Sequence, residues 1–160
     1  MESNESGQLE KWIRQAFWFL VEHYDFRYEE YVEGHSDFVS EKVKIRVEPG
    51  HKTPYTFIYR VGEPEFTRLV LEGILAYLEG KPPDVNFQAH SLKHNLEIEA
   101  NILKERTRKI IGEIDDWWIP IHKFHYELDR EEYRKSGQMD VFLSSYGRHY
   151  NYLKSKGAIK

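Results

Sequence analysis

Strict alternation of apolar and charged residues near the middle of the chain limits the folds that it can adopt. In "VKIRVE", Val43, Ile45 and Val47 alternate with charged residues, and "YTFIYRV" at 55–61 alternates again after the turn sequence "PGHKTP". Successive side chains of a strand point to opposite faces, so two such runs joined by a turn predict an antiparallel hairpin. Pro54 is expected at the start of the second strand because it has no N–H to donate.

Helical spacing surrounds this hairpin. Residues 8–24 are predicted to form an amphipathic helix, and further helices are predicted at 64–79, 88–118, 121–134 and 139–154. Pro120 is expected to end the third of these five helices and to open the fourth. "FRYEEYV" is a candidate for one more strand. The order predicts an α+β fold with an N-terminal helix, a small antiparallel sheet of two or three strands, and then about four helices.

Length and composition favour one globular domain over residues 1–160, in which residues 1–7 are expected to be flexible. The chain has 160 residues, of which 40% are hydrophobic, and it has no cysteine. The absence of cysteine excludes disulfides and thiolate metal sites. No apolar run approaches the roughly 20 residues that cross a bilayer, and the N-terminus lacks the pattern of a secretory signal. We therefore expect no membrane association and a cytoplasmic location.

The negative charge is concentrated near the N-terminus. Residues 1–41 contain ten acidic and three basic residues, whereas the remainder contains seventeen acidic and twenty basic residues. Clustered acidic charge attracts basic partners and repels nucleic acid. The sequence pI of about 6.1 also argues against a nucleic-acid partner.

Four histidines have spacings that allow metal binding. His90 and His94 are four residues apart, His122 and His125 are three apart, and Asp115 or Asp116 could add an oxygen ligand. However, no HExxH motif is present, and a straight helix would separate the two pairs by roughly 40 Å. We predict no metal and no cofactor, and a histidine-dependent metal protein or enzyme remains an alternative.

No recognised catalytic motif is present, which favours a protein that is not an enzyme. The G-x-S-x-G and P-loop patterns are both missing. The adjacent Trp117 and Trp118 would point about 100° apart on a helix, so we expect one to be buried and the other to be exposed. Exposed tryptophan is enriched at the centre of binding interfaces, and Trp118 is the candidate.

The layout of residues 9–78 resembles the small cytoplasmic immunity proteins of bacterial toxin systems. The resemblance rests on an aromatic-rich first helix leading into "YDFRYEEY", the hairpin, and a helix that opens with "GEPEF". It is a likeness of arrangement, without a motif that transfers residue by residue. It implies a protein that binds and blocks a cognate toxin and that has no catalytic residues.

A partner surface is predicted where acidic residues and tyrosines alternate. Tyrosines give contact area at low entropic cost, and carboxylates accelerate the encounter with a basic partner such as a nuclease toxin. The candidates are Tyr24, Asp25, Tyr28, Glu29, Glu30, Tyr31, Glu33 and Trp118. Two alternatives stay open: the tyrosines belong to the core, or the chain is a regulatory or scaffold protein that binds a host or phage protein. The sequence allows a monomer or a homodimer.

Overall fold

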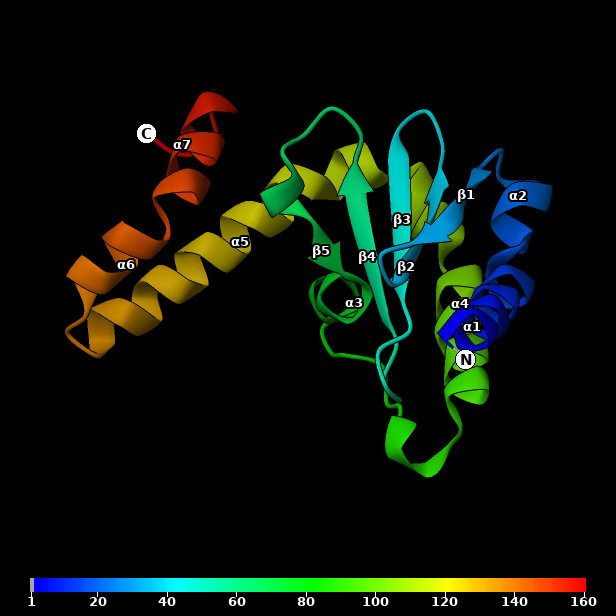
Figure 1. Cartoon of the computed structure of the whole chain (residues 1–160). Coiled ribbons are helices and arrows are strands. Elements are labelled where there is room, and N and C mark those ends of the chain that lie inside the picture. The colour runs from blue at the N-terminus through cyan, green and yellow to red at the C-terminus, as the bar shows by residue number, and fades with distance from the viewer. Residues whose placement is uncertain (1) are drawn as a thin grey trace. The chain divides into compact units, whose positions relative to one another are not determined.

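The computed structural model describes the backbone of residues 2–160 and the side chains of residues 5–160 (Figure 1). The chain divides into two compact units, one that ends at Ile111 and one that covers Gly112–Lys160. The organisation of residues 1–160 as one domain stays a prediction. Residues 1–7 were expected to be flexible, and residue 1 lies outside the described residues.

The first unit is built on a five-stranded antiparallel sheet. The strands are β1 (Arg27–Val32), β2 (His35–Val39), β3 (Val43–Glu48), β4 (Tyr55–Arg60) and β5 (Leu69–Val70), and they lie in sequence order across the sheet. The α+β class and the leading helix are confirmed, but the prediction of two or three strands is wrong. β2 was missed because "HSDFV" is short and carries an aspartate, and β5 has only two residues.

The register of the hairpin separates a buried face of the sheet from a charged one. Val47 lies opposite Thr56 and Ile45 lies opposite Ile58, and all four side chains are inaccessible to solvent. Phe38 of β2 lies opposite Ile45 and continues the same buried face. The second hairpin strand therefore buries Thr56 and Ile58, while its aromatic residues share the other face with the charged residues of β3.

Helices of the first unit cover the buried face. They are α1 (Glu2–Phe17), α2 (Phe19–His23), α3 (Leu71–Glu79) and α4 (Leu92–Glu105), with short 3₁₀ helices at Glu65–Thr67 and Phe87–Ala89. α1 begins before the expected residue 8, and the helix breaks at Trp18. α4 packs against α1 and passes behind the sheet in the view of Figure 1. Asn95 of α4 is buried and donates to the carbonyls of Lys52 and Phe87, which fixes two loops against the helix.

The predicted helix over 88–118 is wrong, because the chain departs from α-helical geometry between α4 and α5. A π-helical segment, Arg108–Gly112, follows α4, and α5 then runs over Ile114–Lys135. Pro120 lies inside α5 and does not end a helix. It removes the helical donor to the carbonyl of Asp116, a residue that is exposed, so water can take the place of that donor.

The second unit is a helical assembly with an aromatic core. α5 is followed by α6 (Met139–Ser145) and α7 (Gly147–Ser155), which replace the single last helix that was predicted. Phe142 of α6 contacts the rings of Tyr126 and Tyr133 of α5, with centroids 5.2 and 5.7 Å apart. Tyr146, at the break between α6 and α7, stacks on Phe142 and donates to Asp129 Oδ2 at 2.8 Å.

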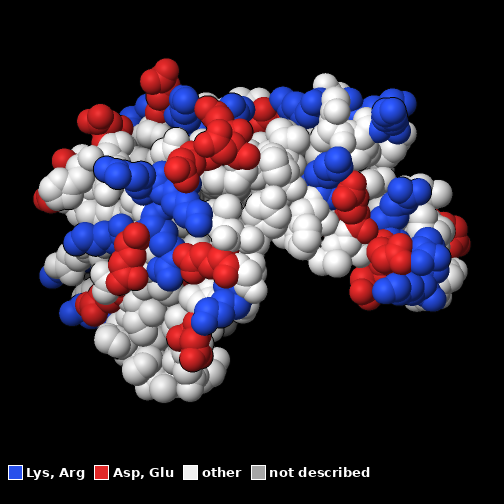
Figure 2. Space-filling view, turned by 180° about the vertical axis from the view of Figure 1, so that it is seen from behind, with Lys and Arg blue, Asp and Glu red and all other residues white. Residues whose placement is uncertain are grey.

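The surface mixes charges of both signs. Figure 2 shows, on the face seen from behind, lysine and arginine side chains interspersed with aspartate and glutamate. Among the described residues, no helix combines the length and the apolar character that crossing a membrane requires.

Gly50 in the turn between β3 and β4 is expected to tolerate no side chain. Its φ is +62°, and a Cβ atom would lie 2.6 Å from the carbonyl oxygen of Thr53. We expect Gly50→Ala to lower the free energy of unfolding by about 2 kcal/mol or more, because a clash adds to the left-handed strain. Gly34→Ala is the matched control, because Gly34 has φ +83° but no atom within 4 Å of the added Cβ. Urea unfolding of both variants measures the difference, and equal losses would contradict the clash.

Candidate functional site

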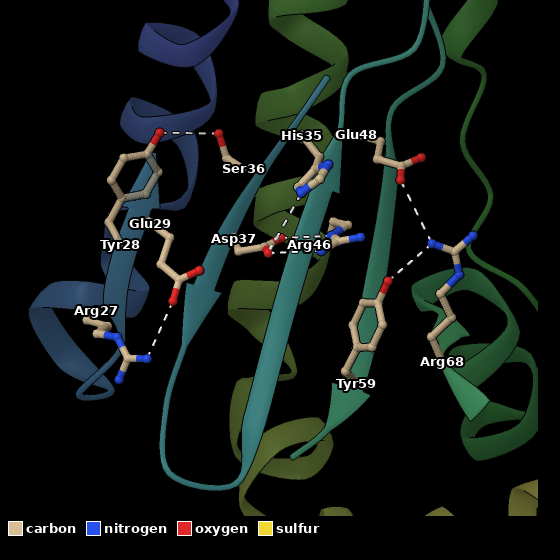
Figure 3. Close-up of polar contacts among 10 residues, drawn as sticks. All are labelled: Arg27, Tyr28, Glu29, His35, Ser36, Asp37, Arg46, Glu48, Tyr59 and Arg68. Carbon is tan, nitrogen blue, oxygen red and sulfur yellow. Dashed lines mark hydrogen bonds and ion pairs between the residues drawn. The ribbon is translucent and has the colours of Figure 1, made fainter. Parts of the chain in front are cut away.

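The charged face of the sheet in the first unit carries a connected set of ion pairs and cation–π contacts. We call it the open face. Figure 3 draws part of it, including Asp37, Arg46 and Tyr59, with helix behind the strands. Its members come from all of the first four strands and from the segment before β5: Arg27, Glu29, His35, Asp37, Lys44, Arg46, Glu48, Tyr55, Phe57, Tyr59 and Arg68.

A bidentate ion pair holds the centre of the open face. Asp37 lies opposite Arg46, whose Nε and Nη2 donate to Asp37 Oδ1 and Oδ2 at 2.9 and 3.1 Å. His35 Nε2 lies 3.8 Å from Asp37 Oδ2. Hydrogen bonding to the Asp37 carboxylate raises the pKa of the Arg46 guanidinium above its ordinary value. Since the two charges satisfy each other, this pair cross-links β2 to β3 and leaves recognition to its neighbours.

Cations lie over the aromatic rings of β4. Lys44 Nζ is 4.2 Å from the centroid of Tyr59, and Arg68 Cζ is 4.0 Å from that of Phe57. Arg68 Nη1 also donates to the Tyr59 hydroxyl at 3.1 Å and lies 3.9 Å from Glu48 Oε1 (Figure 3). Tyr55 stacks beside Phe57 and is 46% exposed. The result is an ordered strip of rings and cations that a partner can contact with little loss of side-chain entropy.

A hollow of about 370 Å³ opens between the centre of this face and the β4–β5 connection. Glu29, Asp37, Glu63 and Glu65 bring carboxylates to its lining, and Lys44 and Arg60 bring cations. Asp37 is held by Arg46, and Glu63 accepts from Arg60 Nη1 at 3.1 Å. The remaining carboxylates are those of Glu65 and of Glu29, and Glu29 forms an exposed ion pair with Arg27 at 3.4 Å. The hollow can therefore accept a cationic group next to the Tyr59 ring.

Two of the predicted partner-binding tyrosines attach β1 to α1. The Tyr28 hydroxyl donates to Glu10 Oε2 at 2.8 Å, and the backbone N–H of Tyr31 donates to the same oxygen at 2.7 Å. Mainly through burial, the pKa of Tyr28 rises to about 12. The hydrogen bonds from Tyr31 and then Tyr28 lower the pKa of the Glu10 carboxyl. Tyr28 lies opposite Phe38, so its ring faces the buried side of the sheet.

The other predicted residues of this segment are exposed but do not share one face. Tyr24 lies at the end of α2, with its ring against the edge of Phe19. Asp25 and Glu33 have positive φ angles, 59° and 52°, in the connections before and after β1. Glu30 is exposed on β1. Of the predicted set, only Glu29 reaches the hollow of the open face.

The expectation that one tryptophan of the pair is exposed is wrong. Trp117 and Trp118 are 4% and 1% exposed. Trp118 Nε1 donates to the Tyr152 hydroxyl of α7 at 2.9 Å, and its ring lies against His122 with the centroids 4.7 Å apart. Trp118 is therefore a buried core residue, and its hydrogen bond to Tyr152 ties α5 to α7.

The four candidate histidines form two separate pairs in the chain. His90 and His94 have ring centroids 4.6 Å apart and are exposed, whereas His122 is buried and His125 is half-buried in α5. Burial lowers the pKa of His125. Over the described residues, no group of three or more histidine, cysteine, aspartate or glutamate side chains is arranged to hold a metal ion.

Sequence reasoning missed two central residues of the open face, Lys44 and Tyr59. The alternation of the hairpin did place Lys44 on the charged side of β3 and Tyr59 on the aromatic side of β4. It did not show that the two residues lie opposite each other, which depends on the strand register. Comparison of this chain with models of protein families, with curated proteins and with solved structures found no match.

Proposed function

We propose that the chain is a protein-binding module that recognises a basic group of its partner at the hollow of the open face. The observation that carries the proposal is the pair of carboxylates without a buried counter-charge, Glu29 and Glu65, beside the Tyr59 ring. A lysine or arginine side chain fits this environment, because it can form charge-assisted hydrogen bonds with both carboxylates.

A protein partner suits the open face better than a nucleic acid does. Rings on an open antiparallel sheet can stack on bases, but a nucleic-acid surface also needs unopposed positive charge along the backbone. Here Arg46 is paired with Asp37, and Arg68 lies 3.9 Å from Glu48. Tyr59 is only 7% exposed, which leaves little of its ring for a base to cover.

Immunity to a toxin is the specific form of binding that we propose. The layout of residues 9–78 resembles cytoplasmic immunity proteins, and a basic substrate groove of a nuclease toxin would complement an acid-lined hollow. In this form the protein acts in the cytoplasm, covers the active surface of the toxin and performs no chemistry itself.

The test begins with pull-down and mass spectrometry to identify the partner, followed by titration calorimetry with the purified pair. We expect Glu29→Lys with Glu65→Lys to weaken binding by about tenfold or more, because two attractive contacts become repulsive. Glu30→Lys with Glu33→Lys makes the same change of net charge on acidic residues outside the hollow, so it is the matched control. The proposal fails if the control weakens binding as much as the first variant, or if neither variant weakens it.

A further inference from the structure

A second and larger hollow lies between α1 and α4 in the first unit. It measures about 770 Å³ and shares no residue with the hollow of the open face. Trp18 and Phe19 supply its aromatic lining, and Lys11, Arg14 and Lys104 supply positive charge. This volume falls in the range of about 300–1,000 Å³ that is typical of ligand-binding clefts.

The cations of this groove are available to a ligand. Among the described side chains, Lys11 and Lys104 form no ion pair, and Lys104 Nζ lies 5.9 Å from the centroid of Phe19. The guanidinium of Arg14 lies 5.2 Å from the Trp18 centroid and 5.0 Å from that of Tyr28. Stacking of this kind orients the guanidinium but leaves its N–H donors free to bind carboxylates.

Among the described side chains, the two acidic residues of the lining form no ion pair with these cations, although the charge of Arg14 contributes to the lowered pKa of Glu10. Glu10 directs Oε2 toward β1, where it accepts from Tyr28 and from the backbone of Tyr31. Glu22 lies 3.7 Å from the exposed ring of His23. An occupant of the groove therefore meets an aromatic wall flanked mainly by positive charge.

We infer that this groove docks an acidic peptide segment of a protein partner, with an apolar side chain against Trp18 and carboxylates near Lys11, Arg14 and Lys104. Two parallel or antiparallel helices commonly present such a groove to a peptide that carries apolar anchors. Charge complementarity selects the acidic composition. The groove extends the proposed function, because it would bind an acidic segment of a protein partner, whereas the open face would bind a basic group.

The probe is a fluorescein-labelled peptide of twelve residues that alternates Glu or Asp with Leu or Phe, and its binding to the full chain is followed by fluorescence anisotropy. We expect saturable binding that weakens about tenfold or more in Lys11→Glu with Lys104→Glu. Ala16→Glu should also weaken it, since Ala16 lines the groove and the new side chain adds bulk and negative charge. The matched control is Lys81→Glu with Lys93→Glu, which changes the net charge equally outside the groove.

Three results would overturn the inference: no saturable binding of the acidic peptide, equal binding of a peptide with lysine in place of the acidic residues, or equal losses in the groove and control variants. A single-stranded oligonucleotide of the same charge is tested in parallel. If it binds more tightly than the peptide and responds to the groove variants alone, the occupant is a nucleic acid and the peptide is excluded. Circular dichroism of each variant establishes that its fold is retained. Failure at this groove leaves the test of Glu29 and Glu65 unaffected, so the two proposals fail separately.

Discussion

Replacement of Trp118 by alanine is expected to lower the free energy of unfolding by about 3–5 kcal/mol, the usual cost of truncating a large buried aromatic residue. Trp118 is 1% exposed, and its indole N–H donates to the Tyr152 hydroxyl at 2.9 Å. The truncation leaves a cavity next to His122 and removes the donor of a buried hydrogen bond. Urea unfolding followed by near-ultraviolet circular dichroism measures the loss.

Two further variants separate packing from hydrogen bonding at Trp118. Trp118→Phe keeps a buried ring without the N–H group, so its loss should fall between those of wild type and Trp118→Ala. Tyr152→Phe removes the acceptor of the indole N–H while keeping both rings, with an expected loss of about 1–3 kcal/mol. A stable Trp118→Ala protein that no longer bound its partner would contradict the core role and restore Trp118 as an interface residue.

The hairpin was predictable from the sequence because its information is local. Strand alternation and a turn rich in glycine and proline are properties of neighbouring residues, and they gave β3 and β4 correctly. β2 and β5 depend on pairing with strands already in the sheet. "HSDFV" buries Asp37 because Arg46 lies opposite it, and no residue of the short segment itself shows this.

The helix boundaries and the candidate site failed for a related reason. Continuous apolar spacing between α4 and α5 predicted one helix, whereas the chain passes through a π-helical segment at Arg108–Gly112. Likewise, acidic and aromatic residues that are adjacent in the sequence of β1 point to opposite faces. Glu29 reaches the open face, whereas Tyr28 turns toward Glu10 and Ser36. A prediction of surfaces therefore required the sheet register, which periodicity alone does not supply.

Stability that falls with rising pH is the expected consequence of a carboxyl group buried under the sheet. Glu99 of α4 is inaccessible to solvent, and its carboxyl group lies close to the buried Thr56 and to Glu72. Burial, and secondarily the nearby Glu72 of α3, raises the pKa of Glu99 from 4.5 to about 9. The group is therefore protonated in the folded protein at neutral pH and ionised in the unfolded chain.

The direction of the effect follows from proton uptake on folding. Below pH 4.5 Glu99 is protonated in both the folded and the unfolded state, so it does not lower the free energy of unfolding. Between pH 4.5 and about 9 only the folded state holds the proton, and the free energy of unfolding falls with each pH unit. The cost is about 1.4 kcal/mol per unit, or about 3 kcal/mol at pH 7. Above pH 9 the penalty is complete and no longer grows.

Glu99→Gln should remove this dependence, because the amide has nearly the shape of a protonated carboxyl and does not ionise. Unfolding free energies of both proteins, measured in urea from pH 5 to pH 9, should diverge as the pH rises, with the variant more stable by about 3 kcal/mol at pH 7. Glu97→Gln, an exposed glutamate of the same helix, is the matched control. Parallel curves for wild type and Glu99→Gln would show that Glu99 does not retain its proton.

Glu72→Gln distinguishes the two causes of the raised pKa at Glu99. Removing the neighbouring carboxylate eliminates its contribution but leaves the burial of Glu99 in place, and burial is the larger cause. The pH dependence of Glu72→Gln should therefore keep the slope of wild type above pH 4.5 but level off at a lower pH than that of wild type, whereas Glu99→Gln should show no such dependence. A complete loss of slope in Glu72→Gln would instead assign the shift to repulsion between two carboxylates, in which case the proton belongs to the pair of residues and not to Glu99 alone.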